Sequence, residues 1–120
     1  MIEGEWLRDG SHVNAMGANR LETRELDDAA IRRCAFVATD SIEQAREEGG
    51  DLVDPINRGL ITWDRVHELC EVVAGKVSGR TNADEITLFK SHGIAMEDVA
   101  VAAFVYERAR DREIGKSISL

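Results

Sequence analysis

The sequence predicts an α/β domain with about three parallel strands, flanking helices and a long C-terminal helix. Short apolar runs at residues 12–16, 35–38 and 85–89 have the length of strands, and stretches with helix start and stop signals separate them. Parallel strands need helical connections that return the chain to the same edge of a sheet, so this alternation favours a parallel sheet with right-handed crossovers. A length of 120 residues suits one modest core, so we expect residues 1–120 to form a single domain.

The first predicted helix lies between the first two predicted strands in the sequence. Apolar and polar residues alternate over His12 to Met16, and this strand is expected to end at Gly17. Asp27 is a suitable N-cap for a helix that runs to about Arg33. The second strand is the continuous apolar run Ala-Phe-Val-Ala over residues 35–38.

Two short helices are expected next. Ser41 and Gln44 have the spacing of a capping box, and Gly49-Gly50 stops the helix that they begin. Asp54-Pro55 can open a second helix, because proline is tolerated at the first helical position, and Gly59 closes it.

The second half of the chain predicts two more helices around a strand. Thr62 is expected to cap a helix that ends at Gly75, with one apolar face made of Val66, Leu69, Cys70 and Val73. The third strand is residues 85–89, and the last helix runs from about Ile94 to Arg112. That helix has one apolar face with Val99, Ala103 and Tyr106 and another with Val101 and Val105.

The bulk composition excludes several classes of function. With 15 basic and 23 acidic residues and a net charge of -8, the chain has no basic excess to neutralise phosphates, which argues against nucleic acid as a partner. No apolar run approaches the ~20 residues that cross a membrane, and the N-terminus does not resemble a signal peptide, so we expect a cytoplasmic protein. Cys34 and Cys70 lie in apolar runs without metal-ligand spacing, so we expect buried, reduced thiols and no metal.

The chemistry is expected where the strands end, because ligands of parallel sheets bind beyond the carboxyl ends of the strands. Gly17 allows close approach of a ligand to the backbone, Asn19 offers an amide, and Ser91 and His92 offer a hydroxyl and an imidazole. Each also suits an ordinary turn or a solvated loop. The chain has no GxGxxG, P-loop or GxSxG motif, so the residues by themselves indicate a small α/β domain with a candidate small-molecule edge.

Three stretches resemble the ornithine cyclodeaminase and mu-crystallin family. They are HVNAMGANRLETRELD, GRTNADEIT with the following LFKSHGIAMEDVAVAAFVY, and EWLRDG ahead of the first strand. Members of this family are NAD(P)(H)-dependent cyclodeaminases, reductases of cyclic imines, or alanine dehydrogenases. The resemblance implies a partial Rossmann-like domain, since it reaches only the end of the family's Rossmann domain and the helix that leads out of it.

The resemblance assigns a cofactor role to four residues. Met16, Gly17 and Ala18 match the family's nicotinamide-side loop, and Ser91 matches a serine near the nicotinamide ring. The cofactor implied is NAD(P)(H). The glycine-rich loop that would hold its pyrophosphate has no counterpart in the sequence.

Two further positions bear on the reaction. His92 falls where the family often has an apolar residue that touches the substrate, and Asn19 falls where cyclodeaminases carry a catalytic aspartate. An amide takes up no proton at neutral pH, so Asn19 argues against cyclodeaminase chemistry. The Lys90-Ser91 pair is more similar to the imine-reductase branch.

We therefore interpret the chain as a truncated relative that is not catalytic by itself and keeps remnants of a nicotinamide-side site. One alternative is a self-associating interaction or small-ligand-binding module. Another is a partial imine reductase or dehydrogenase that a separately encoded N-terminal half completes.

The partner expected for this chain is itself, as a homodimer. The resemblance implies that the strand His12 to Met16 is an unpaired edge, because the strand beside it in the family, which leads into the glycine-rich loop, has no counterpart in the sequence. This would place Val13 and Ala15 at or near an interface. The last helix offers a second surface through Val101, Phe104 and Val105. No nucleic acid or membrane partner is expected.

Overall fold

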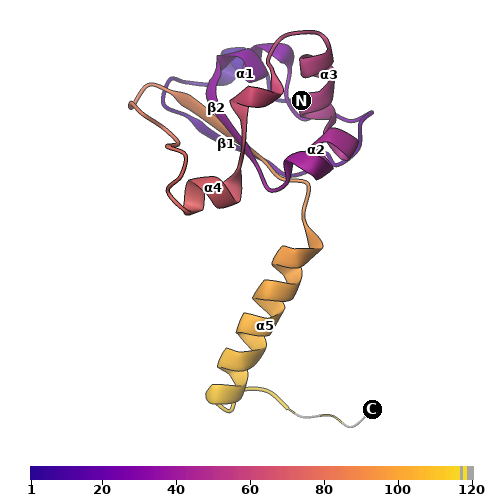
Figure 1. Cartoon of the computed structure of the whole chain (residues 1–120), viewed down its shortest axis with the longest axis vertical. Coiled ribbons are helices and arrows are strands. Elements are labelled where there is room, and N and C mark those ends of the chain that lie inside the picture. Colours follow the sequence, from indigo (N-terminus) through magenta and orange to yellow (C-terminus); the bar gives the residue numbers. More distant parts are fainter. Residues whose placement is uncertain (117, 119–120) are drawn as a thin grey trace.

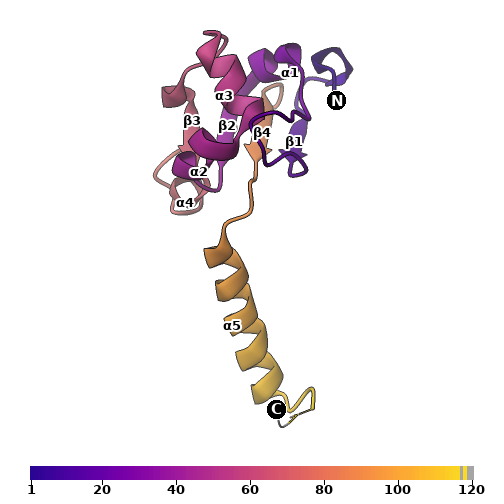
Figure 2. The same ribbon diagram turned by 90° about the vertical axis from the view of Figure 1, so that its right-hand side faces the viewer.

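The computed structural model, which describes residues 1–116 and 118, is built around a sheet of four parallel strands. These are β1 (His12–Ala15), β2 (Cys34–Thr39), β3 (Val66–Glu68) and β4 (Ile86–Lys90), in the spatial order β1-β4-β2-β3. Figure 2 shows the four strands side by side. The predicted α/β class and parallel sheet are confirmed.

The register of the sheet brings all four strand ends to one level. Ala15 pairs with Lys90, Lys90 with Thr39, and Thr39 with Glu68, and these are the last residues of the four strands. The segments that follow β1, β2 and β4 therefore leave the sheet at the same edge.

Three helices cover one face of the sheet: α1 (Asp28–Arg33), α2 (Ile42–Glu48) and α3 (Gly50–Asn57). The Asp27 carboxylate caps α1 by accepting the amide N–H of Ala30 at 2.7 Å, as predicted. Ser41 caps α2 by accepting the amide N–H of Gln44 at 3.2 Å. The N–H of Ser41 itself donates to Asp40, so the reciprocal half of the capping box is not made by Gln44.

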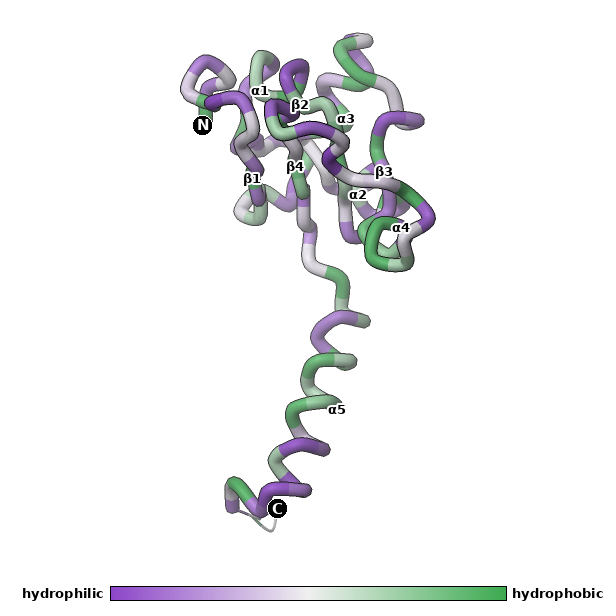
Figure 3. The backbone as a smooth tube through the Cα atoms, turned by 90° about the vertical axis from the view of Figure 1, so that its left-hand side faces the viewer, coloured by the Kyte–Doolittle hydropathy of each residue, from purple (hydrophilic) through white to green (hydrophobic). Residues whose placement is uncertain are grey.

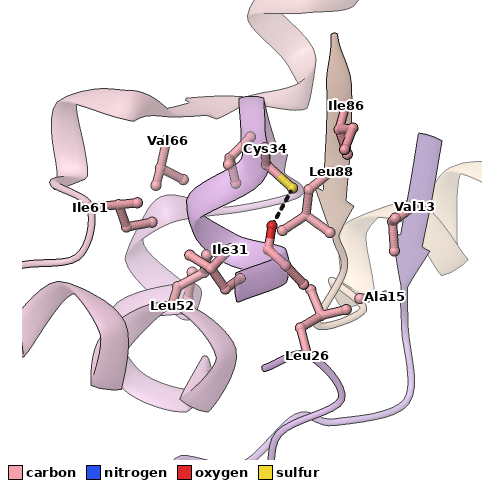
Figure 4. Packing of buried hydrophobic residues seen from close by; sticks show 13 residues of the cluster. Val13, Ala15, Leu26, Ile31, Cys34, Leu52, Ile61, Val66, Ile86 and Leu88 are labelled. Atoms are coloured by element: carbon pink, nitrogen blue, oxygen red, sulfur yellow. Dashed lines mark hydrogen bonds between the residues drawn. The ribbon is translucent and has the colours of Figure 1, made fainter. Parts of the chain in front are cut away.

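The core lies between this sheet face and the three helices. It is formed by alternate strand side chains and the inward faces of the helices, and Figure 4 labels ten of its members: Val13, Ala15, Leu26, Ile31, Cys34, Leu52, Ile61, Val66, Ile86 and Leu88. The Cys34 thiol donates to the carbonyl oxygen of Ala30 at 3.1 Å. Cys34 is buried as predicted, but Cys70 is exposed, so the prediction of two buried thiols is wrong for Cys70.

The segment predicted as one helix from Thr62 to Gly75 forms three elements instead. These are a 3₁₀ turn η2 (Trp63–Arg65), β3 (Val66–Glu68) and α4 (Leu69–Val73). Val66 pairs with Val37 and is buried in the core, and the ring of His67 stacks on Phe36 at a centroid distance of 5.0 Å. Tertiary pairing with β2 overrides the helical spacing, so the sheet has four strands and not three.

The helix α3 begins four residues before the predicted start at Asp54. A Cβ on Gly50 would lie 2.5 Å from the carbonyl oxygen of Thr23, so this glycine packs against the preceding loop and opens α3 rather than only ending α2. Pro55 lies inside the helix instead of at its first position. Gly59 has φ of +72° just after α3 and stops it, as predicted.

The opposite face of the sheet is covered only in part, by α4. A cavity of about 380 Å³ lies there, lined by side chains from the outward-facing positions of three strands and from α4, among them His12, Asn14, Phe36, Phe89 and Leu69. A 3₁₀ turn, η1 (Gly4–Trp6), packs against α1 at the N-terminal side.

The last helix, α5 (Ala95–Asp111), projects away from the rest of the protein (Figure 1). None of its side chains is buried, and Figure 3 shows apolar and polar residues mixed along its length. The radius of gyration is 17.4 Å, whereas a compact domain of this length has about 13.6 Å. In the part of the chain that the structure describes, no helix is both long and apolar enough to cross a membrane.

Candidate functional site

The loop after β1 and the segment after β4 lie side by side at the carboxyl edge of the sheet. The Ser91 amide donates to the carbonyl oxygen of Ala15 at 3.0 Å, and the Lys90 ammonium donates to the carbonyl oxygen of Ala18 at 2.6 Å. The structure therefore brings the predicted cofactor residues Met16, Gly17 and Ala18 close to Ser91, although 75 residues separate Met16 from Ser91 in the chain.

The Glu25 carboxylate holds the loop after β1. Its Oε2 accepts the amide N–H groups of Gly17 and Ala18 at 2.8 and 3.0 Å. Partial burial by itself would raise the pKa of Glu25, but these two hydrogen bonds and the nearby Lys90 ammonium together lower it. Glu25 is therefore ionised at neutral pH and fixes the backbone of the loop.

A buried lysine links this carboxylate to Asp51 on α3. Lys90 ends β4, its side chain has no exposed surface, and its Nζ lies 2.9 Å from Oε2 of Glu25 and 3.3 Å from Oδ2 of Asp51. The other oxygen of Asp51 accepts the amides of Glu25 and Leu26 at 2.9 and 3.0 Å. The contact between Lys90 and Asp51 is an ion pair without hydrogen-bond alignment. We refer to Glu25, Lys90 and Asp51 as the loop clamp.

A second carboxylate holds the segment after β4. Oδ2 of Asp40, which follows β2, accepts the Ser91 hydroxyl at 2.8 Å and the amides of His92 and Gly93 at 2.9 and 2.8 Å. Burial opposes the ionised form, but the hydrogen bonds from Ser91, Gly93 and His92 lower the pKa of Asp40. The Ser91 hydroxyl is thus oriented by Asp40 and is itself largely buried.

The ring of His92 is enclosed in the protein. Its Nδ1 lies 3.5 Å from both Oδ1 of Asp40 and Oγ1 of Thr39, and its Nε2 has no hydrogen-bond partner among the residues that the structure describes. A Cβ on Gly49 would come within 2.9 Å of Nε2, so glycine makes room for the ring. Burial, with the charge of Lys90, lowers the pKa of His92 more than Asp40 raises it. Contact of His92 with a substrate would need this segment to open, and it stays a prediction.

Among the predicted site residues, Met16, Gly17 and Asn19 are exposed to solvent. The Met16 side chain is 66% exposed, and Asn19 is exposed at the end of the same loop, whereas Ala18 is buried. Since Glu25 occupies the N–H groups of Gly17 and Ala18, these two amides are not available to a ligand, and the exposed Met16 side chain is the apolar group that this loop offers. Such a group suits an aromatic ring better than a phosphate. No group of three His, Cys, Asp or Glu side chains that could hold a metal occurs among residues 1–116 and 118.

The sequence interpretation missed the loop clamp. Lys90 falls on the same face of its strand as Ile86 and Leu88, because side chains alternate along β4, and this pattern predicts a buried ammonium that needs acidic partners. Sequence spacing does not identify those partners, since Asp51 lies on α3 and Glu25 precedes α1.

The fold and this edge define a Rossmann-like α/β domain with a candidate ligand edge at the carboxyl ends of its strands. A sequence model of the ornithine cyclodeaminase/mu-crystallin family matches residues 1–113, and the chain belongs to this family. The predicted resemblance is confirmed.

Known relatives are enzymes with longer chains. The chain is 43% identical over 118 residues to the Delta(1)-pyrroline-2-carboxylate reductase of Bacillus cereus, which covers 98% of this chain and 36% of the relative. It is 39% identical to a Thermococcus litoralis enzyme of the same name, solved in complex with NADH and L-proline, with a TM-score of 0.86 over 98% of this chain and 36% of that one. An archaeal alanine dehydrogenase dimer with bound NAD is 36% identical, with a TM-score of 0.82 over 99% of this chain and 37% of that one. The chain thus spans little more than a third of the length of these relatives.

Proposed function

We propose that this chain provides the nicotinamide side of an NAD(P)(H) site of the reductase or dehydrogenase type, and that a polypeptide of these 120 residues alone does not catalyse. The observation that carries the proposal is the shared edge, where the loop Met16–Ala18 and Ser91 are held side by side by buried charges. Two similar structures contain NADH or NAD.

The residues at the edge favour reduction or dehydrogenation over cyclodeamination. Asn19 stands where cyclodeaminases carry an aspartate, and an amide cannot act as a base. Hydride transfer instead requires a positioned nicotinamide ring, and a loop with a fixed backbone such as Met16–Ala18 can provide that position.

The same geometry explains why catalysis would need more polypeptide. The cofactor's pyrophosphate needs several free N–H groups, and Glu25 already occupies those of Gly17 and Ala18. Without that anchor and without groups to orient a substrate, hydride transfer lacks the proximity on which it depends. We expect further polypeptide, in the same chain or another, to supply the contacts to the pyrophosphate and to the substrate.

A titration with NADH tests this proposal. The fluorescence of the reduced nicotinamide should change saturably with the 120-residue chain, and nicotinamide mononucleotide should compete whereas ADP-ribose should not. Met16→Glu should weaken binding by placing a carboxylate at the edge, and Met96→Glu on α5, which is equally exposed, is the matched control. Competition by ADP-ribose alone would contradict a nicotinamide-side site, and NADH oxidation with Delta(1)-pyrroline-2-carboxylate would contradict the lack of catalysis.

A second function, self-association, is favoured by α5. Its 17 residues include Val101, Phe104 and Val105, which are 62%, 57% and 57% exposed. A helix of this length without tertiary contacts is only marginally stable in water, so an apolar surface from a second copy would stabilise it.

A homodimer through the edge of β1 stays a prediction, and it would not use the side chains of Val13 and Ala15. The side chains of Val13 and Ala15 are buried in the core of the chain itself, because the pleat turns them toward the helices. Pairing of two β1 strands would use backbone groups and the outward side chains His12 and Asn14.

Sedimentation over a concentration series tests self-association through α5. Phe104→Lys should shift the chain toward monomer, whereas Val73→Lys on α4, an apolar position that is more exposed (80% against 57%), should not. A chain that stays monomeric at high concentration would overturn this second function.

A further inference from the structure

We infer that Glu25, held by Lys90, is the positioning residue that sets the backbone of the loop Met16–Ala18 for a nicotinamide ring. This inference rests on the proposed function and extends it to residues that do not themselves face the cofactor edge. The clamp holds the loop through two kinds of contact. Glu25 accepts two of the loop's N–H groups, and Lys90 donates to one of its carbonyl oxygens.

The charged groups of the loop clamp contact one another and the backbone of the loop. The Lys90 ammonium donates to the carbonyl oxygen of Ala18 at 2.6 Å and to Oε2 of Glu25 at 2.9 Å, and it forms an ion pair with Oδ2 of Asp51 at 3.3 Å. The single oxygen Oε2 of Glu25 accepts three donors, and the other carboxylate oxygen accepts none. A fully buried ammonium costs several kcal/mol unless it is paired in this way, so the loop backbone and the charge pair hold each other in place.

The loop sequence is adapted to the carboxylate. A Cβ on Gly17 would lie 2.8 Å from Oε1 of Glu25, and the backbone at Gly17 does not have a positive φ. Glycine therefore lets the Glu25 carboxylate approach the loop closely, since a side chain here would force that carboxylate to shift, and it is not needed for an unusual turn. The carboxylate accepts the N–H groups that would otherwise attract a phosphate, and the Met16 side chain beside them stays exposed for contact with a ring.

Backbone amide exchange and NADH binding, measured on the same variants, test the inference. Glu25→Ala removes both the charge and the acceptor, and Glu25→Gln keeps an acceptor oxygen for the loop. Asp27→Ala, two residues away, removes a helix cap and destabilises the protein without touching the loop. Urea unfolding of each variant measures its general loss of stability.

If Glu25 has a positioning role, the NADH affinity of the variants should correlate with the amide protection of the loop Met16–Ala18 and not with their free energy of unfolding. Glu25→Ala should expose the amides of Gly17 and Ala18 to exchange, leave β4 protected and weaken NADH binding by about tenfold or more. Glu25→Gln should retain most of the affinity, and Asp27→Ala should keep the wild-type dissociation constant despite its lower stability.

Two outcomes would overturn the inference. One is a loss of affinity in Asp27→Ala that matches the loss in Glu25→Ala, which would mean that Glu25 acts only through stability. The other is undiminished protection of the Gly17 and Ala18 amides in Glu25→Ala. If the wild-type chain does not bind NADH, the proposed function fails, and the amide protection still decides whether Glu25 positions the loop.

Discussion

Replacing Asp40 by alanine should release the segment that leads from the sheet into α5. In the wild-type protein, one carboxylate oxygen of Asp40 accepts the Ser91 hydroxyl and the amides of His92 and Gly93, all within 2.9 Å. The side chain of Asp40 has no exposed surface, so alanine leaves the Ser91 hydroxyl and the His92 amide without this acceptor in a site that water reaches poorly, and the Gly93 amide keeps only Oγ of Ser91 at 3.2 Å.

The expected loss follows from the number of donors. Hydrogen bonds to a charged acceptor contribute about 1.5–3 kcal/mol each to the free energy of unfolding. Partial entry of water and rotation of the Ser91 hydroxyl recover some of this, so we expect Asp40→Ala to lower the free energy of unfolding by about 3–5 kcal/mol. With a urea m-value of about 1.5 kcal/mol per molar, the unfolding midpoint should fall by about 2–3 M. Asp40→Asn keeps one acceptor oxygen and should lose about 1–2 kcal/mol.

Tryptophan fluorescence during urea unfolding measures this loss. Trp63 packs against the core and lies under the guanidinium of Arg46 at 4.5 Å, so its emission reports on the folded domain. Because the folded-state pKa of Asp40 is lowered, its contribution is complete above the unfolded pKa of about 3.9 and is lost as the pH falls through the folded value. The difference between wild type and Asp40→Ala should therefore shrink in acid. An unchanged midpoint in both variants, or a difference independent of pH, would refute the reasoning.

Three further predictions concern other parts of the protein. Cys70 is exposed and should react rapidly with a thiol-reactive disulfide reagent, whereas Cys34, whose pKa burial raises to about 11, should react only on unfolding, and equal rates would contradict this burial. The His92 imidazole should titrate below pH 6.5 in an NMR titration, so its neutral form stabilises the fold fully above that pH and less as the pH falls, and a midpoint at or above 6.5 would show that the ring is not buried. Gly17→Ala should displace the Glu25 carboxylate and shift the amide resonance of Ala18 in an NMR spectrum, and an unshifted resonance would contradict the close approach.

Much of the fold could be predicted from local patterns. The strands that contain Val13 and Leu88 and the cap at Asp27 depend on residues close together in the sequence, and the structure has them within one residue of the expected positions. The strand β3 could not be predicted in this way. Val66 and Leu69 fit the face of a helix, and only the pairing of Val66 with Val37, which lies on β2, makes this segment a strand.

The location of the candidate site residues at the strand ends could be predicted, but the carboxylates that hold these residues could not. The residues that follow β1 and β4 were located from the strand ends, since parallel strands present these ends at one edge. The carboxylates that hold them, Asp40, Glu25 and Asp51, come from three other parts of the chain, and only the folded arrangement shows which amide or ammonium each one accepts.

The measurement that tests the central claim most directly is an NMR map of NADH on the 120-residue chain. We expect nuclear Overhauser effects between the nicotinamide ring protons and the Met16 methyl group, with amide shifts confined to the loop Met16–Ala18 and to Ser91. Nicotinamide contacts confined to the cavity beneath α4, or to α5, would contradict a nicotinamide site at the carboxyl edge of the sheet.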